Sequence, residues 1–161
     1  MAPSARAATA GRPTARAYAG LQLRIVAFIL DVLVLISFGM LFAAAAGAYL
    51  IVDSSFNDGN LSDRAPYVAV VIFLVYVFAF VPLYHILLWS SRGQTVGMMA
   101  VHIKVLSRNG GRVTRRRSAL RLFGYAASVL PLFLGLLMAL FDRKRRTLHD
   151  RLAGTVVVEE P

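Results

Sequence analysis

Cysteine is absent from this sequence of 161 residues, and acidic residues are scarce. Without cysteine, the chain has no disulfide framework, no thiolate metal ligand and no cysteine nucleophile. Only 8 Asp and Glu stand against 18 Lys and Arg, so the formal net charge is +10. A balance this basic is typical of chains that bind nucleic acid or anionic lipid, or whose cations set a membrane topology. The positions of the cations decide among these classes.

Apolar residues are abundant. They make up 58% of the chain, which is too many for an ordinary soluble domain and indicates a membrane protein. A bilayer core of ~30 Å needs about 20 apolar residues as a helix. Three stretches meet that length, at residues 25–52, 66–89 and 122–141. We expect them to form a single membrane domain over residues 20–161.

The tail before the first apolar stretch is rich in arginine and contains no acid. Its composition also resembles a transit peptide, but we interpret residues 1–19 as a disordered basic tail on the cytoplasmic side. The first apolar run is far longer than the ~7 to 15 residues of a secretory signal. We therefore expect it to remain as a spanning helix.

The distribution of charge predicts the orientation of the first two helices. Residues 1–23 hold three arginines, whereas residues 53–65 hold three aspartates and one arginine. Because cations favour the cytoplasmic side, the N-terminus is expected inside and the first connection outside. The second connection, 90–119, holds seven cations and no acid, which places it inside.

The third apolar stretch conflicts with this rule, because a full crossing would carry the basic C-terminal tail outside. Pro131 near its middle, with Gly124 and Gly135 on either side, favours a break or kink. A re-entrant segment would keep both ends cytoplasmic. Twenty residues are also just enough to span the bilayer, so both arrangements stay open.

Two short segments have strand patterns. The stretch "VHIKVLSRNGGRVT", 101–114, alternates apolar and polar residues up to Asn-Gly-Gly, which predicts a small cytoplasmic β-hairpin. The stretch "GTVVVEE", 154–160, is β-branched and too short to be stable alone. Its natural partner is the strand at 101–106. Such pairing would hold the loop and the tail on one side of the membrane.

Three features in order resemble the RDD family of small bacterial membrane proteins: Arg24 with Asp31, "GQTVGMMAVHIKVLSRNGGRV", and "FDRKRRTLHDRLAGTVVV". The resemblance covers about Gly20 to Val158. It implies a mainly α-helical integral protein of the plasma (inner) membrane, with Arg24, Asp31 and Asp150 as the polar residues of the family motif. Relatives often carry a lysine where this chain has Met98. Some members have been linked to cation/proton antiport, and a eukaryotic relative to membrane quality-control complexes.

Asp31 lies inside the first apolar stretch, where a lone carboxylate costs at least ~3 kcal/mol and needs a partner or a task. Arg24 lies seven residues earlier, about 10 Å along a helix, and leans away toward the N-terminus. We therefore expect Arg121 as the first candidate partner of Asp31 and His85 as the second. We interpret Asp31 and its cationic partner as a buried polar clamp that fixes helix register, with a proton or cation relay as the alternative.

His149 and Asp150 supply too few ligands for a zinc site, so no metal site and no cofactor are expected. We interpret Asp150 as a tether to arginine or backbone groups of the cytoplasmic hairpin, with His149 as a possible member of the same network. "GQTVG" lacks the Gly-Lys-Ser/Thr end of a phosphate-binding loop, and its glycines favour a tight turn.

Two basic runs adjoin the apolar stretches and lack the interleaved aromatics that stack on bases, so nucleic acid is not an expected partner. Anionic lipid headgroups are the simpler partner, each nearby cation contributing ~1 kcal/mol. The residues expected to contact headgroups are Arg115, Arg116, Arg117, Arg143, Lys144, Arg145 and Arg146.

No nucleophile with a base, no paired carboxylates and no metal cluster are evident, so we do not expect an enzyme. The favoured hypothesis is an integral inner-membrane protein with an intramembrane Arg/Asp network and a basic cytoplasmic platform. That platform would bind lipid, a membrane-protein partner or a second copy of the chain. The alternative is a cation/proton transporter that uses Asp31, which would have to be oligomeric because three segments are few for a complete pathway.

Overall fold

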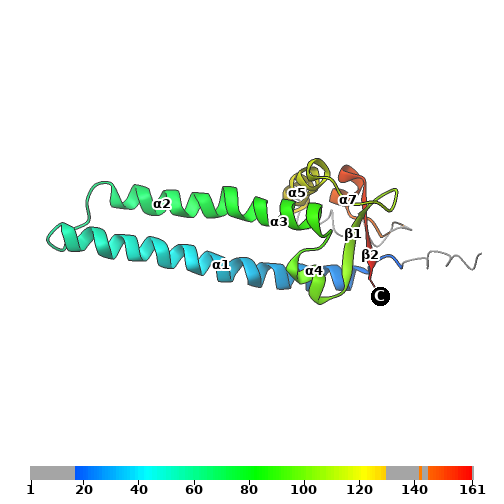
Figure 1. The fold of residues 1–161 in the computed structure, drawn as a ribbon, viewed down its shortest axis with the longest axis horizontal. Coiled ribbons are helices and arrows are strands. Elements are labelled where there is room, and N and C mark those ends of the chain that lie inside the picture. Colours follow the sequence, from blue (N-terminus) through cyan, green and yellow to red (C-terminus); the bar gives the residue numbers. More distant parts are fainter. Residues whose placement is uncertain (1–16, 130–141, 143–144, 161) are drawn as a thin grey trace, which may run out of the picture.

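The computed structural model describes residues 17–129, 142 and 145–160. Two long helical rods lie side by side and are joined by a short loop at one end (Figure 1). At the other end, smaller helices and a two-stranded sheet gather around the bases of the rods. This second end, called the polar end below, comprises residues 17–31 and 84–160 as far as they are described.

The first rod is helix α1, Leu21–Phe56, and its buried residues are Arg24, Ala27 and Asp31. The second rod consists of α2, Ala65–Val75, the π-helical turn η1, Tyr76–Phe80, and α3, Val81–Ser91. Within the described residues, these are the two helices long and apolar enough to cross a membrane. Many of their large apolar side chains are exposed, as expected for helices surrounded by lipid, while Phe38 and Phe42 of α1 pack against Phe80 of the second rod. The first two predicted spans are confirmed as helices.

The π-helical turn precedes Pro82, which has no N–H to donate and whose ring crowds the preceding turn. A wider turn accommodates it, and the N–H of Val81 bonds the carbonyl of Tyr76. Tyr76 then donates its hydroxyl to the carbonyl of Leu35 at 2.5 Å. The break in the regular helix thus lies where the second rod is tied to the first.

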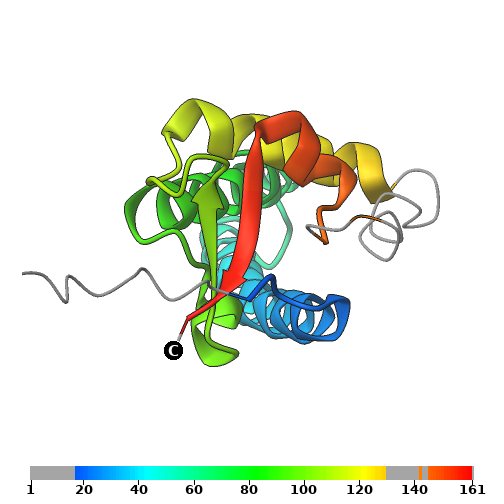
Figure 2. The same cartoon turned by 90° about the vertical axis from the view of Figure 1, so that its right-hand side faces the viewer.

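The polar end contains α4, Val96–Ala100, β1, Ile103–Ser107, α5, Arg115–Val129, α7, Leu148–Ala153, and β2, Thr155–Glu159. Helix α5 runs across the axis of the two rods instead of alongside them (Figures 1 and 2). It packs against α3 on one side and α7 on the other. Gly124 allows this contact, because a Cβ there would lie 2.7 Å from His149 Cβ.

Strands β1 and β2 pair antiparallel, with Val105 opposite Val157, which confirms the predicted pairing of the C-terminal strand. The expected hairpin within 101–114 is wrong in its second half, because residues 112–114 form no strand. The N–H of Ser107 instead bonds the carbonyl of Gly111 at 2.9 Å, and Val113 turns into the core. The β-branched tail pairs with the other edge of β1, where the N–H of Arg108 bonds the carbonyl of Gly154, while the N–H of Val105 bonds the carbonyl of Gly93 on the edge that faces Gly111.

The other edge of β2 contacts the residues before α1. Tyr18 forms a β-bridge with Val158, and the N–H of Ala19 bonds the carbonyl of Val157 at 3.0 Å. The expectation that the disordered tail extends to residue 19 is therefore wrong at its last residues, because β2 offers them backbone partners. Residues 1–16 lie outside the described residues.

The buried apolar core lies at the polar end, where residues from α1, α3, α4 and the sheet meet. Its members are Ala19, Ala27, Trp89, Met98, Ile103, Val105, Val113 and Val157. The third apolar stretch is described only up to Val129, as the second half of α5. Residues 130–141, with Pro131 and Gly135, lie outside the described residues, so the re-entrant arrangement stays a prediction.

Candidate functional site: two buried carboxylates and two arginines

Asp150 is fixed by the start of helix α7. Thr147 is the N-cap residue, and the sequence Thr-x-x-Asp forms a reciprocal capping box. The Asp150 carboxylate accepts the Thr147 N–H at 3.3 Å and its hydroxyl at 2.9 Å. The same carboxylate thereby caps the helix and is aimed toward the base of α1.

Two arginines from distant parts of the chain bind this carboxylate. Arg24 Nη1 of α1 lies 2.5 Å from Oδ2, and Arg121 Nη1 of α5 lies 2.7 Å from Oδ1. Thr155 of β2 donates to Oδ1 at 3.3 Å and accepts from Arg121 at 3.1 Å. The side chains of Arg121 and Asp150 are 0% exposed, and that of Arg24 is 5% exposed. Asp150 thus joins α1, α5, α7 and β2.

The charges at this junction are well defined. Burial favours the neutral form of Asp150, but the guanidinium groups of Arg121 and Arg24 outweigh it and hold the pKa of that carboxyl well below its usual range. His149 is adjacent, and its burial lowers its pKa to about 3. Its Nε2 lies 2.8 Å from the Thr147 hydroxyl, and its ring stacks on Tyr125. At neutral pH the junction therefore holds two cations, one anion and a neutral imidazole.

Asp31 has a separate set of partners. It accepts the hydroxyl of Tyr84 at 2.7 Å, the hydroxyl of Thr95 at 2.5 Å and the N–H of Gly97 at 2.8 Å. Three donors, from the second rod, the turn that follows it and α4, satisfy the carboxylate. Among the described residues, Asp31 is thus bound by neutral donors and not by a cation.

The expected partners of Asp31 are wrong. Arg121 binds Asp150 and places its Cζ 4.9 Å from the centre of the Trp89 ring, because α5 approaches the α7 side of the junction. His85 Nδ1 lies 3.0 Å from its own helix carbonyl at Val81. The expected tether of Asp150 to arginine is confirmed, although Arg24 and Arg121 belong to α1 and α5 rather than to the hairpin.

"GQTVG" supplies the groups that sequence reasoning missed. Thr95 caps α4, and Gly97 presses that helix onto α1, where an added Cβ would lie 2.1 Å from the carbonyl of Ala27. Gly93 has a φ of 75°, which fits the predicted tight turn. The second glycine therefore permits a close helix contact in addition to the turn. The sequence signal that could have predicted this contact is a threonine suited to an N-cap, Thr95, two residues before Gly97.

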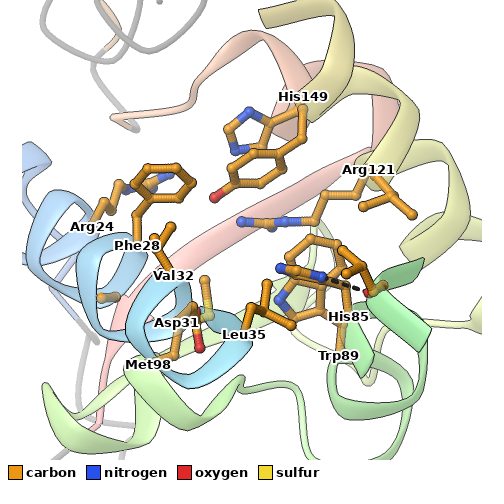
Figure 3. Close-up of a pocket in the computed structure, with 14 residues that line it drawn as sticks. Arg24, Phe28, Asp31, Val32, Leu35, His85, Trp89, Met98, Arg121 and His149 are labelled. Carbon is orange, nitrogen blue, oxygen red and sulfur yellow. Dashed lines mark hydrogen bonds between the residues drawn. The ribbon is translucent and has the colours of Figure 1, made fainter. Parts of the chain in front are cut away.

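A cavity of about 220 Å³ is lined by Asp31 and by the two arginines that bind Asp150 (Figure 3). Arg24 and Arg121 approach it from opposite sides, and Asp31 turns toward Met98 at its lower edge. Met98, which follows the second glycine of "GQTVG", is buried and lines the cavity. The cavity is thus lined by both charged and apolar side chains.

The basic residues predicted to contact headgroups differ in exposure and in hydrogen bonding within the chain. Arg115 and Arg116 are exposed at the start of α5, whereas Arg117 donates to the Ser107 hydroxyl. Arg145 is exposed. Arg143 and Lys144 lie outside the described residues. Arg115, Arg116 and Arg145 thus form the exposed part of the predicted platform.

Arg146 is engaged within the chain, because it donates to both oxygens of Asp142, at 2.9 and 3.1 Å. Arg151 also donates to Oδ1 of Asp142, at 2.9 Å. The hydrogen bonds from Arg146 hold the pKa of Asp142 well below its usual range. Within the described residues, no group of three or more His, Asp and Glu side chains could hold a metal ion.

The RDD family model matches residues 18–154. The chain belongs to the RDD family. This family is membrane-associated, in agreement with the two apolar rods. Of the RDD motif residues, the fold joins Arg24 to Asp150 and holds Asp31 apart on the α4 side.

One curated relative is the uncharacterized protein RP437 of Rickettsia prowazekii (strain Madrid E), which is 32% identical over 77 residues. The match covers 47% of this RDD chain and 42% of the relative, so the chain spans less than half of that protein's length. No solved structure matches the chain.

Proposed function

We propose that the chain is a non-enzymatic, multi-pass protein of the bacterial plasma membrane, with its N-terminus in the cytoplasm. Its polar end would present a basic platform to anionic headgroups, and through them to a membrane-protein partner or a second copy of the chain. The observation that carries this proposal is the separation of charge along the rods. The loop between the rods holds Asp58 and Asp63, while the opposite end holds the exposed arginines of the platform.

The direction of α5 supports a cytoplasmic position for everything at the polar end. A helix that crosses the axis of two spanning rods lies roughly in the plane of the membrane (Figure 2). Arg115 and Arg116 stand at its first turn, where they can reach the headgroup layer. The residues on both sides of 130–141 lie at the same end of the molecule, which supports a third segment that does not cross.

The platform is tested with the full-length protein in nanodiscs. A shift from neutral lipid to lipid with an anionic fraction should raise the thermal unfolding temperature, because each cation near the surface gains ~1 kcal/mol. Replacing Arg115 and Arg116 with glutamine should reduce that shift. The control is Arg64→Gln at the loop end, which should leave it unchanged. An equal shift in both variants would contradict the platform.

The orientation is tested by cysteine labelling, which suits a chain without cysteine. Positions must be exposed, so Ser55 at the loop end and Asn109 and Leu152 at the polar end are suitable. A cysteine at position 55 should react with a membrane-impermeant reagent in intact cells. Those at 109 and 152 should react only after the membrane is opened. Labelling at 152 in intact cells would overturn the orientation of the C-terminal part.

Asp31 supports a structural role over ion carriage, because three donors already satisfy its carboxylate. Asp31→Asn should therefore lower thermal stability in detergent. In reconstituted vesicles, the wild type and the variant should both show the same ion flux as vesicles without protein. Flux in the wild type that the variant abolishes without loss of stability would favour the transporter instead.

A further inference from the structure

The cavity between α1, α3, α5 and α7 contains donors that the protein itself does not use. Among the described residues, Arg24 Nη2, Arg121 Nε, Arg121 Nη2 and Trp89 Nε1 are buried without a hydrogen-bond partner. All three residues line the cavity and are at least nine-tenths buried. Leaving a buried polar group unsatisfied costs about 1–3 kcal/mol, and more for a charged group. Four such nitrogens at one cavity point to a ligand that accepts hydrogen bonds.

The arginine side of the cavity favours an anion. Arg24 and Arg121 share the single carboxylate of Asp150, each using Nη1, so the cluster keeps one excess positive charge. Asp31 also lines the cavity and keeps its negative charge, because Tyr84, Thr95 and Gly97 are neutral donors, but these donors hold its oxygens on the α4 side, away from the Asp150 cluster. Asp150 holds both arginines in place, and Trp89 supports the face of Arg121. The donors are therefore positioned before any ligand arrives.

The number of donors distinguishes among anions. A carboxylate offers two oxygens, whereas a phosphate group offers three or four, and planar guanidinium groups bind phosphate oxygens in pairs. We propose that this cavity binds one phosphate group, whose oxygens accept from the free nitrogens of Arg24, Arg121 and Trp89. A volume of about 220 Å³ has room for several waters and hence for such a group.

The residues that line the cavity help to distinguish two sources of the phosphate group, a phospholipid headgroup and free phosphate. Besides the charged residues, the cavity is lined by Phe28, Val32, Leu35 and Val81 of the two rods. Phe28 is 41% exposed, so the apolar wall continues to the lipid-facing surface. A phospholipid could place its headgroup at the arginines and its chain along this wall, while free phosphate would use the arginines alone. The inference does not depend on the basic platform, which uses other residues.

The test uses the full-length protein in a neutral detergent and its single tryptophan, Trp89, as the reporter. Inorganic phosphate and a short-chain phosphatidic acid are titrated separately at constant ionic strength, with sodium chloride and short-chain phosphatidylcholine as references. A saturable change in Trp89 fluorescence with either phosphate probe is expected. Saturation by both indicates recognition of phosphate itself, and saturation by the lipid alone indicates that the acyl chain contributes. A change with neither probe, or an equal change with both references, overturns the proposal.

Two variants test the position of the ligand. Arg121→Lys keeps the positive charge but loses the extra guanidinium nitrogens, and it should weaken the apparent affinity at least tenfold. Val32→Phe fills the cavity and keeps every charge, so it should weaken binding even if Arg121→Lys fails to fold. The matched control is Arg108→Gln, an exposed cation of the polar end outside the cavity, which should bind within twofold of the wild type. Wild-type affinity in Val32→Phe, or an equal loss in Arg108→Gln, would place the ligand elsewhere.

Discussion

The two ends of the rods use charged residues in opposite ways. At the loop end, Asp58 and Asp63 are exposed, and the Asp53 carboxylate accepts from the N–H and the hydroxyl of nearby Ser62. At the polar end, Asp150 is fully buried and bonds Arg24, which lies 126 residues away in the chain. Charge at the loop end thus interacts with water and near neighbours, whereas the buried charge at the polar end joins elements that are distant in the sequence.

This difference sets how each end responds to mutation. Burying an ion pair gains little net free energy, because desolvation offsets the attraction between the charges. Removing one member alone is costly, since its partner stays buried without compensation. We therefore expect large effects at the polar end and small ones at the loop end.

The largest effect is expected for Asp150→Ala, which leaves Arg24 and Arg121 buried without a carboxylate and removes the Asp150 half of the capping box of α7. The free energy of unfolding in detergent should fall by about 3–5 kcal/mol. The matched variant at the other end is Asp58→Asn, which should change it by less than about 0.5 kcal/mol because the side chain is exposed. Similar losses in both variants would remove the contrast between the ends.

A second contrast compares two glycines of the membrane domain. In Gly97→Ala the new Cβ would lie 2.1 Å from the Ala27 carbonyl, so α4 must move away from α1 and weaken the bond to Asp31. A loss of about 1–3 kcal/mol in the free energy of unfolding is expected from such overpacking. Gly47→Ala in α1 meets nothing within 4 Å and should be neutral or slightly stabilising. Denaturation of the two variants under identical conditions measures the difference.

Gly97 also shows where sequence reasoning stops. The apolar runs at 25–52 and 66–89 predict both rods, because a long lipid-facing helix has a clear composition. The β-branched tail similarly predicts its pairing with β1. The partner of Asp31 could not be predicted, because a backbone N–H has no signature in the sequence and becomes available only when α4 docks. The expected pairing of Arg121 with Asp31 is wrong because the angle of α5, which brings Arg121 to Asp150, is set by tertiary packing.

The pH dependence of stability gives a smaller contrast, between a buried and an exposed histidine. Burial lowers the pKa of His149 to about 3, whereas an unfolded histidine titrates near ~6.5. The unfolded state therefore binds the proton first, so the contribution of this residue is fully present above pH 6.5 and is lost progressively as the pH falls toward 3. Between pH 7 and pH 5 the loss is about 2 kcal/mol.

Denaturation at the two pH values tests this, with His149→Gln expected to lose that part of the pH dependence. His102→Gln is the control, because His102 is exposed at the same end. An unchanged pH dependence in His149→Gln would show that other groups carry it.

The smallest effect is expected for an ion pair at the polar end that is not buried. Lys104 Nζ lies 2.8 Å from Glu160 Oε1, but the two side chains are 28% and 35% exposed. Water and salt screen such a pair, so Lys104→Gln should lower the free energy of unfolding by less than about 1 kcal/mol. Raising the salt to about 1 M shortens the screening length to ~3 Å and should remove most of that difference. The loss in Asp150→Ala should persist in the same salt, because its cost comes from burial. A loss in Lys104→Gln that does not change with salt would contradict this prediction. It would show that the burial of a charged side chain does not decide how strongly its replacement lowers the free energy of unfolding.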